Sequence, residues 1–271
     1  PLTFCAGGSV TLTSSSATTY LWSTGATTRS INVNTSGNYT VQVTNSTGCE
    51  SQVSEPITVA VVALPSAPTI AASGPTTICA GGSVTLTSSP GTTYLWSTGA
   101  TTQNINVTTA GSYTVRIANS EGCQSPSSTA TVITVNPNPG VNAGVDASIA
   151  NGTSTTLNGT VTGTGPFTYS WTPASLLVNA TLVDPVTVNL TSTTTFTLTA
   201  TIIATGCSAS DAVTVSVTGG ALNANPTATP GSVCAGSNVQ LDAAASGGSG
   251  TYTYSWSSVP AGFASTVARP V

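Results

Sequence analysis

The sequence has almost no charge. Its 271 residues contain no lysine and no histidine, and only 4% are charged, against about a quarter in ordinary globular proteins. The three basic residues are Arg29, Arg116 and Arg269. Binding to phosphate groups needs clustered Lys and Arg side chains, so we expect no nucleic-acid partner. An anionic membrane surface would attract this chain just as weakly.

Long apolar runs are absent too. A membrane-spanning helix needs about 20 consecutive apolar residues, and no run in the sequence approaches that length, so we expect no membrane insertion in this segment. Disorder is also excluded, because Val, Ile, Thr and aromatic residues recur too regularly for a disordered tail. No charged and apolar leader opens the sequence, so we expect any signal peptide to have been removed or to lie outside this segment.

Residues for catalysis are scarce. Without His and Lys, the commonest general bases and amine nucleophiles are missing. Glu50 and Glu55 share one repeat, but Gln124 and Thr129 stand in their places in the next copy. A glycosidase needs two carboxylates in one unit, and a calcium site needs a dense set of acidic ligands. We therefore expect no enzyme, no metal and no cofactor. The seven acidic residues are Glu50, Glu55, Glu121, Asp146, Asp184, Asp211 and Asp242.

What the chain does contain is an internal repeat. The eleven residues TTYLWSTGATT occur at Thr18–Thr28 and again at Thr92–Thr102. Over the longer segments Cys5–Cys49 and Cys79–Cys123, 34 of 45 positions are identical without a gap, and most differences fall at polar positions. The two copies therefore share one core and differ at their surfaces.

Two more copies follow, one longer and one partial. The third contains Trp171, Phe196 and Cys207, and the fourth contains Cys234 and Trp256. Pro-containing joints lie between the copies and should act as short semi-rigid spacers. We divide the chain into repeat 1 at residues 1–64, which lacks its first strand, repeat 2 at 65–136, the longer, PKD-like repeat 3 at 137–219, and the partial repeat 4 at 220–271.

Apolar residues alternate with Thr, Ser, Asn and Gln within each repeat. Val10 with Leu12 and Ile31 with Val33 are examples. A period of two is typical of half-buried strands, and Gly-rich stretches separate the strands as turns. No segment has a helical pattern. The sequence predicts an all-β fold of tandem immunoglobulin-like sandwiches, arranged as an extended rod.

Each repeat carries one tryptophan, for which there are two interpretations. An exposed indole could stack on sugars, whereas a buried one would centre a structural module. Tyr20 and Trp22 are two residues apart and share the parity of the other apolar positions, so we favour the core. The predicted core aromatic residues are Trp22, Trp96, Trp171, Trp256, Tyr39 and Tyr113.

The stretch TYLWSTGATT, followed by the Gly37-x-Tyr39 pair before an alternating strand, resembles polycystic-kidney-disease (PKD) and related immunoglobulin-like domains. The Gly-x-Tyr pair is similar to the tyrosine corner of sandwich folds. Repeat 3 resembles repeats of very large surface proteins of Bacteroidetes, including gliding-motility adhesins exported by the type IX secretion pathway. The resemblance implies a module of a large cell-surface protein.

The cysteines are regularly spaced. Cys5 and Cys49 are 44 positions apart, as are Cys79 and Cys123. With no His and no Cys-x-x-Cys pair, a zinc site is excluded. The recurring spacing predicts one structural disulfide per repeat, Cys5–Cys49 and Cys79–Cys123, in an oxidising extracellular setting. We expect each bond to clamp one end of its sandwich.

Repeat 3 departs from this spacing. It has Ala150 where the second copy has its first cysteine, so Cys207 lacks its predicted partner. Two alternatives remain open: Cys207 is a free thiol, or it bonds to Cys234.

These features predict a structural segment of an extracellular or cell-surface adhesin or filament, serving as a stalk or fibre shaft in adhesion or gliding. The expected partners are neighbouring repeats of the same chain, with identical chains in a fibre and surface glycans as further candidates. The alternative is a set of carbohydrate-binding accessory modules on a secreted multidomain hydrolase.

Overall fold

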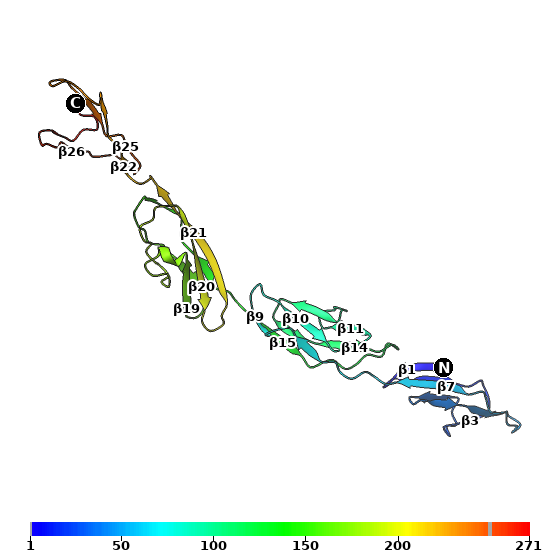
Figure 1. Cartoon of the computed structure of the whole chain (residues 1–271). Coiled ribbons are helices and arrows are strands. Elements are labelled where there is room, and N and C mark those ends of the chain that lie inside the picture. Colours follow the sequence, from blue (N-terminus) through cyan, green and yellow to red (C-terminus); the bar gives the residue numbers. More distant parts are fainter. Residues whose placement is uncertain (1, 249–250) are drawn as a thin grey trace. The chain divides into compact units, whose positions relative to one another are not determined.

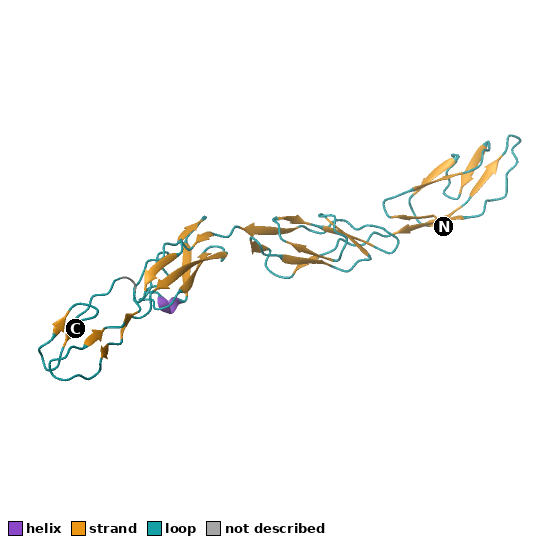
Figure 2. Ribbon diagram, turned by 90° about the horizontal axis from the view of Figure 1, so that it is seen from above, coloured by secondary structure: helices purple, strands orange, loops and turns teal. Residues whose placement is uncertain are grey.

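The computed structural model describes residues 2–248 and 251–271. Within those ranges nearly every element is a β-strand, and the one helical element is the 3-10 turn η1 (Ala174–Leu176). The chain divides into two compact units, Pro1–Val135 and Asn136–Val271, which we describe separately. The strands of both units form tandem immunoglobulin-like sandwiches (Figures 1 and 2).

Repeat 1 contains seven short strands. They are β1 (Leu2–Cys5), β2 (Val10–Thr13), β3 (Thr19–Trp22), β4 (Ser30–Val33), β5 (Gly37–Tyr39), β6 (Val41–Thr44) and β7 (Ile57–Val62). One sheet has the order β1-β7-β5, and β2 pairs with β4 and β3 with β6. The β1–β7 pair is parallel, and the other pairs are antiparallel.

The alternation in the sequence places one set of side chains in the core of repeat 1. Along β3, Trp22 is 3% exposed while its neighbour Leu21 is 53% exposed, as a period of two requires. The buried cluster is Leu12, Trp22, Ile31, Val33, Tyr39 and Val59.

The duplicated eleven residues form a turn that closes on its own tryptophan. The backbone N–H of Trp22 donates to the carbonyl of Ala26 at 2.9 Å, and the indole N–H donates to the carbonyl of Thr28 at 2.8 Å. Gly25 has φ +84°, which a residue with a side chain adopts only at a cost. In repeat 2, the indole N–H of Trp96 likewise donates to the carbonyl of Thr102, at 2.8 Å.

Repeat 2 is built on the same plan and has one strand more. Its strands are β8 (Ile70–Ala72), β9 (Thr77–Cys79), β10 (Val84–Ser88), β11 (Thr93–Trp96), β12 (Asn104–Val107), β13 (Gly111–Tyr113), β14 (Val115–Ala118) and β15 (Thr131–Asn136). The extra strand β8 pairs with β10. The core contains Val84, Leu86, Trp96, Ile105, Val107, Tyr113, Val115 and Ile133.

The tyrosine corners form in both repeats. The hydroxyl of Tyr39 donates to the carbonyl of Thr35 at 2.9 Å, and that of Tyr113 donates to the carbonyl of Thr109 at 3.0 Å. Both rings are buried. Each phenol therefore pins the loop four residues before it to the sandwich.

Repeat 3, in the second unit, has the largest core. Its strands are β16 (Gly140–Asn142), β17 (Ala147–Ala150), β18 (Thr160–Thr162), β19 (Phe167–Thr172), β20 (Thr194–Ile202) and β21 (Ser208–Thr218). Four of them form the sheet β17-β21-β20-β19, and β16 pairs with β18. Trp171, Phe196 and Leu198 are fully buried at its centre.

Repeat 4 has only short strand pairs. Its strands are β22 (Asn223–Ala224), β23 (Thr227–Thr229), β24 (Gln240–Asp242), β25 (Ala245–Ser246), β26 (Trp256–Ser257) and β27 (Ala264–Ser265). Trp256 is half-buried, because strands of two or three residues do not cover it as the longer sheets cover the other tryptophans. The prediction that Trp256 is a core residue is therefore met only in part.

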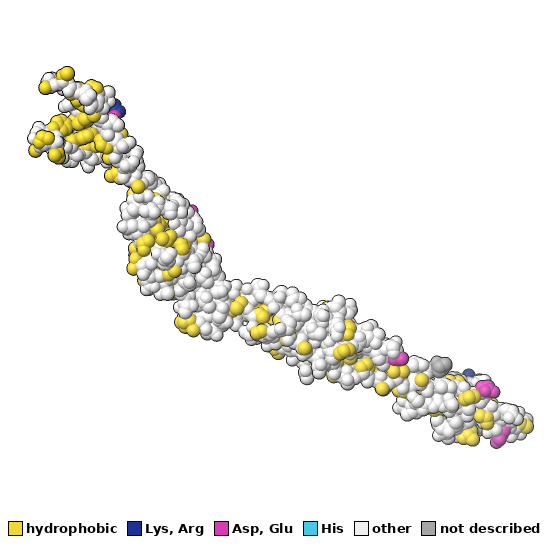
Figure 3. Space-filling view, viewed as in Figure 1, with side chains coloured by type: hydrophobic (Ala, Val, Ile, Leu, Met, Phe, Trp, Pro, Cys, Tyr) yellow, Lys and Arg dark blue, Asp and Glu magenta, His cyan; other side chains and the backbone are white. Residues whose placement is uncertain are grey.

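Charged side chains are sparse on the face shown in Figure 3. Among the described residues, one ion pair forms, between Arg269 and Asp242 at 2.8 Å. The stability of the sandwiches therefore comes from apolar cores and backbone pairing.

Candidate functional site

The disulfides differ from the predicted pairing. Cys5 bonds to Cys123, 118 positions away, and their Cα atoms lie 5.5 Å apart. Cys49, the predicted partner of Cys5, is an exposed free thiol. The Cys5–Cys49 and Cys79–Cys123 bonds are therefore wrong. The bond that forms joins repeat 1 to repeat 2.

Strand direction explains why Cys5 does not reach Cys49. The parallel register of β1 along β7 sets Cys5 opposite Val62, at the end where the chain leaves repeat 1. The antiparallel β5 has Tyr39 opposite Ile57, so the chain runs on through β6 away from Val62. The hairpin that carries Cys49 follows β6, at the other end of the sandwich.

The remaining cysteines also differ from expectation. Cys207 is 1% exposed and is disulfide-bonded, as is Cys79. Cys234 is an exposed free thiol. The free-thiol interpretation of Cys207 is therefore wrong, and so is its bond to Cys234. The structure thus contains two disulfides, and disulfides are typical of proteins that fold in oxidising compartments.

Cys49 lies in a hairpin that an asparagine organises. The backbone N–H of Asn45 donates to the carbonyl of Cys49 at 3.1 Å, and that of Gly48 donates to the carbonyl of Asn45 at 3.1 Å. The side-chain oxygen of Asn45 accepts the backbone N–H of Cys49 at 2.9 Å. Gly48 has φ +83°, which suits glycine. This set of bonds fixes the cysteine at the end of the hairpin turn, opposite Asn45.

Repeat 2 has the same hairpin, and there it contacts repeat 1 through Cys123 and Asn119. Asn119 accepts the backbone N–H of Cys123 at 2.9 Å, and its side-chain N–H donates to the carbonyl of Ala63 in repeat 1 at 3.3 Å. Pro65, which follows repeat 1, lines a concavity beside this hairpin, together with Pro90. Cys123 is 1% exposed. We call this arrangement the closed junction.

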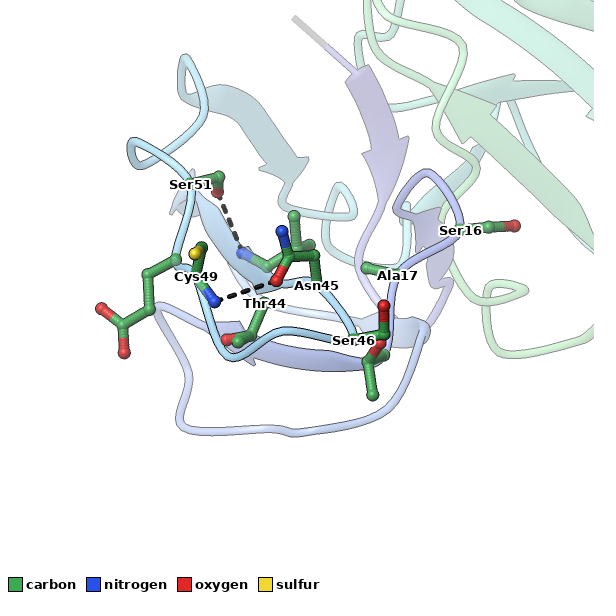
Figure 4. Close-up of a pocket in the computed structure, with 10 residues that line it drawn as sticks. Ser16, Ala17, Thr44, Asn45, Ser46, Cys49 and Ser51 are labelled. Carbon is green, nitrogen blue, oxygen red and sulfur yellow. Dashed lines mark hydrogen bonds between the residues drawn. The ribbon is translucent and has the colours of Figure 1, made fainter.

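The matching surface of repeat 1 is open. A concavity of about 570 Å³ surrounds the hairpin of Cys49 (Figure 4). Its lining residues are Ser16, Ala17, Thr18, Val43, Thr44, Asn45, Ser46, Cys49, Glu50 and Ser51. Among the described residues, none accepts a hydrogen bond from the side-chain N–H of Asn45. We call this surface the open junction.

Sequence reasoning missed Asn45 and Asn119. The signal was present, because both repeats have Asn-Ser-x-Gly-Cys at this point. An asparagine that accepts a hydrogen bond from its own hairpin through Oδ1 still has the two N–H donors of Nδ2. Of these two asparagines, Asn119 uses Nδ2 to bond a residue of another repeat.

The tryptophans of repeats 1 to 3 do not form a sugar-binding surface. Trp22, Trp96 and Trp171 are at most 3% exposed, so their ring faces are not available for stacking. Their indole N–H groups donate to carbonyls of their own repeats; for Trp171 the acceptor is Leu182 at 3.1 Å. These residues organise the core.

Two of the acidic residues hold the backbone of repeat 3. Oδ2 of Asp211 accepts the backbone N–H of Ala143 at 2.8 Å, and Oδ1 of Asp146 accepts that of Thr214 at 2.8 Å. Within the described ranges, no three His, Cys, Asp or Glu side chains lie close enough to hold a metal ion. No helix in the described part of the chain has the length and apolar character that crossing a membrane requires.

No protein-family model matches the sequence, and no curated protein is similar to it. Solved structures of tandem immunoglobulin-like domains overlap with it partially. Sidekick-1 immunoglobulin domains 1–5 show 15% identity and a TM-score of 0.27, over 83% of this chain and 58% of that one. Three consecutive domains of titin show 14% identity and a TM-score of 0.34, over 80% of this chain and 95% of that one.

A bacterial protein gives a similar result. The structure titled "Ca2+-stabilized adhesin helps an Antarctic bacterium reach out and bind ice" shows 16% identity and a TM-score of 0.38, over 83% of this chain and 74% of that one. This chain spans little more than half the length of the Sidekick-1 structure. All three TM-scores are low, so the function proposed below rests on the chain's own residues.

Proposed function

We propose that this chain is a structural segment of an extracellular surface adhesin or filament, a shaft built from four immunoglobulin-like repeats that places an adhesive or motile part away from the cell. The observation that carries the proposal is the Cys5–Cys123 bond, because it joins one repeat to the next. A disulfide that served only to stabilise a small domain would close within that domain.

The position of this bond matters for a chain under tension. A pulling force that reaches Cys5 passes directly to Cys123 through the covalent bond. Residues 6–122, which include most of repeats 1 and 2, then lie inside a covalent loop and cannot be drawn out to their full length. A shaft that must keep its length under load needs this property.

Composition and resemblance support the same role. Few charged residues mean that salt has little effect on the fold. Proteases that cut after Lys or Arg find only Arg29 and Arg116 followed by a residue other than proline. Repeat 3 resembles repeats of large Bacteroidetes surface proteins, including gliding-motility adhesins. The buried state of Trp22, Trp96 and Trp171 does not favour the carbohydrate-binding alternative.

Single-molecule stretching tests the proposal. Pulled from both ends without reductant, the chain should not release residues 5–123. Reduction opens both disulfides, so the added extension should be at least the length of residues 5–123, about 400 Å at roughly 3.4 Å per residue. Cys5→Ser should release residues 5–78 without reductant, about 250 Å at roughly 3.4 Å per residue, because Cys79 stays bonded in the second disulfide. Cys49→Ser should behave as the unmodified chain. Release of residues 5–123 from the oxidised, unmodified chain would contradict a shaft role.

A further inference from the structure

One side chain connects the two segments that the Cys5–Cys123 bond joins. Oδ1 of Asn119 accepts the backbone N–H of Cys123 at 2.9 Å, and Nδ2 of Asn119 donates to the carbonyl of Ala63 at 3.3 Å. Ala63 directly follows Val62, the residue that lies opposite Cys5 in the register of β1 and β7. Asn119 therefore bridges the hairpin that carries Cys123 and the strand end that carries Cys5.

The strand end in repeat 1 is held by bonds that do not depend on the disulfide. Cys5 lies opposite Val62 in the parallel pair, and the backbone N–H of Ala6 donates to the carbonyl of Val62 at 2.8 Å. The backbone N–H of Gly8 donates to the carbonyl of Cys5 at 3.0 Å. These backbone bonds keep Cys5 at the end of β7 whether its sulfur is oxidised or reduced.

The hairpin in repeat 2 is also held by its own bonds. The backbone N–H of Asn119 donates to the carbonyl of Cys123 at 3.2 Å, and that of Gly122 donates to the carbonyl of Asn119 at 3.1 Å. Asn45 and Cys49 make the same bonds in repeat 1. The two hairpins therefore differ in one respect among the described residues, because Nδ2 of Asn119 bonds another repeat and Nδ2 of Asn45 does not.

We propose that Asn119 is a positioning residue that selects the disulfide partner of Cys5. The closed junction assembles through the Asn119 bridge before oxidation, and it brings Cys5 to Cys123 in preference to Cys49. Thiol–disulfide exchange requires that one sulfur reach the other, so the pair that is docked first is the pair that bonds. This inference goes beyond the proposed function, because it concerns how the joint forms and does not require that the chain bear a load.

The bond forms by thiol–disulfide exchange with a small-molecule disulfide such as oxidised glutathione. The thiolate of Cys5, which is half-buried, attacks the oxidant, forms a mixed disulfide and releases one glutathione thiol. The thiolate of Cys123 then attacks the sulfur of Cys5 and releases the second glutathione thiol. Two protein thiols lose two electrons and two protons in total, and one oxidant disulfide becomes two thiols. Asn119 takes no part in these steps and acts only by holding the two sulfurs together.

A matched pair of variants tests the selection. Asn119→Asp keeps the Oδ1 acceptor for the hairpin but removes the N–H that reaches Ala63, and Asn45→Asp makes the same change in repeat 1. The full chain is equilibrated in glutathione buffers and its disulfides are mapped by mass spectrometry. Asn119→Asp should lower the ratio of bonded to reduced Cys5–Cys123 about fivefold, the factor that one hydrogen bond provides, and Cys5–Cys49 should appear. Asn45→Asp should give the ratio of the unmodified chain.

Alkylation of the fully reduced chain measures docking without the bond, and it needs no variant. Cys123 is 1% exposed and Cys49 is exposed, so Cys123 should react more slowly than Cys49 if the junction assembles first. Asn119→Asp should raise the rate at Cys123 about fivefold and leave the rate at Cys49 unchanged. Equal rates at the two thiols of the unmodified reduced chain would overturn the proposal. An Asn119→Asp chain that keeps the original disulfide ratio, or an equal loss in Asn45→Asp, would overturn it as well.

Discussion

Cys5 and Cys123 are separated by 118 positions in the sequence, and their Cα atoms lie 5.5 Å apart. Between them the chain builds most of two sandwiches, so the bond fixes the end of repeat 1 to the hairpin of repeat 2. On the chain-entropy account, closing a loop of this length stabilises the folded state by about 5 kcal/mol. That contribution is comparable with the whole stability of a small domain.

The first prediction concerns the number of free thiols. Alkylation of the unfolded, unreduced chain should modify two cysteines, Cys49 and Cys234. Cys5→Ser should add a third label, at Cys123, because only that thiol loses its partner. Cys49→Ser should leave a single label, at Cys234.

Peptide mass mapping gives the result directly. A chain in which Cys49 resists alkylation while Cys207 reacts would instead support the pairing within a repeat.

The sequence was sufficient to predict the strands and the cores, because a period of two determines which side chains share a face. Trp22 and Leu21 illustrate this, since one is buried and the other exposed. It was also sufficient to place the tyrosine corners, because the local motif specifies the bond from Tyr39 back to Thr35.

The disulfide partners could not be predicted from spacing. Pairing within a repeat and pairing across two repeats use the same four cysteines of repeats 1 and 2, and sequence alone does not give connectivity. The choice depends on which end of the sandwich carries Cys5. That end is set by the parallel pairing of β1 with β7, a long-range contact with no local signature. The role of Asn119 was missed for the same reason, because its partner Ala63 belongs to another repeat.

The second prediction concerns the core of repeat 1. Trp22→Ala removes a side chain that is 3% exposed and should lower the free energy of unfolding by about 3–5 kcal/mol. Amide hydrogen exchange across residues 10–44 should then rise sharply. Leu21→Ala, on the same strand but exposed, is the control and should change stability by less than about 0.5 kcal/mol. Unchanged protection in Trp22→Ala, with loss of glycan binding, would instead favour the sugar-binding interpretation.

The third prediction concerns the tyrosine corner. Tyr39→Phe keeps the buried ring and removes the hydroxyl that donates to the carbonyl of Thr35 at 2.9 Å. The carbonyl loses its partner, so the free energy of unfolding of repeat 1 should fall by about 1 kcal/mol. Tyr113→Phe should have the same effect on repeat 2. Tyr169→Phe is the control, because the structure records no hydrogen bond from that hydroxyl, and equal losses in all three variants would contradict the corner as the cause.

The fourth prediction concerns the close packing of Gly159. A Cβ atom added there would lie 2.5 Å from the carbonyl oxygen of Val183 and 3.2 Å from Cζ2 of Trp171. Neither group can move away easily, since one is backbone and the other is a fully buried ring. Gly159→Ala should therefore lower the free energy of unfolding of repeat 3 by about 1–3 kcal/mol. Gly231→Ala, where an added Cβ meets nothing within 4 Å, should be close to neutral in the same denaturation experiment.

The last prediction concerns the pH dependence of repeat 4. The backbone N–H of Ala244, which donates to the carboxylate of Asp242 at 3.0 Å, is the main cause that lowers the pKa of Asp242 below its ordinary value; partial burial opposes the shift, and Arg269 adds to it. A carboxyl group whose pKa is lower in the folded state than in the unfolded state stabilises the fold above its unfolded-state pKa. This contribution is lost as the pH falls through the folded-state pKa. An NMR titration of Asp242 should therefore give a midpoint below that of an unstructured peptide. Arg269→Gln should raise the midpoint only in part, because the Ala244 bond remains, and a complete return to the ordinary value would show that the ion pair is the main cause.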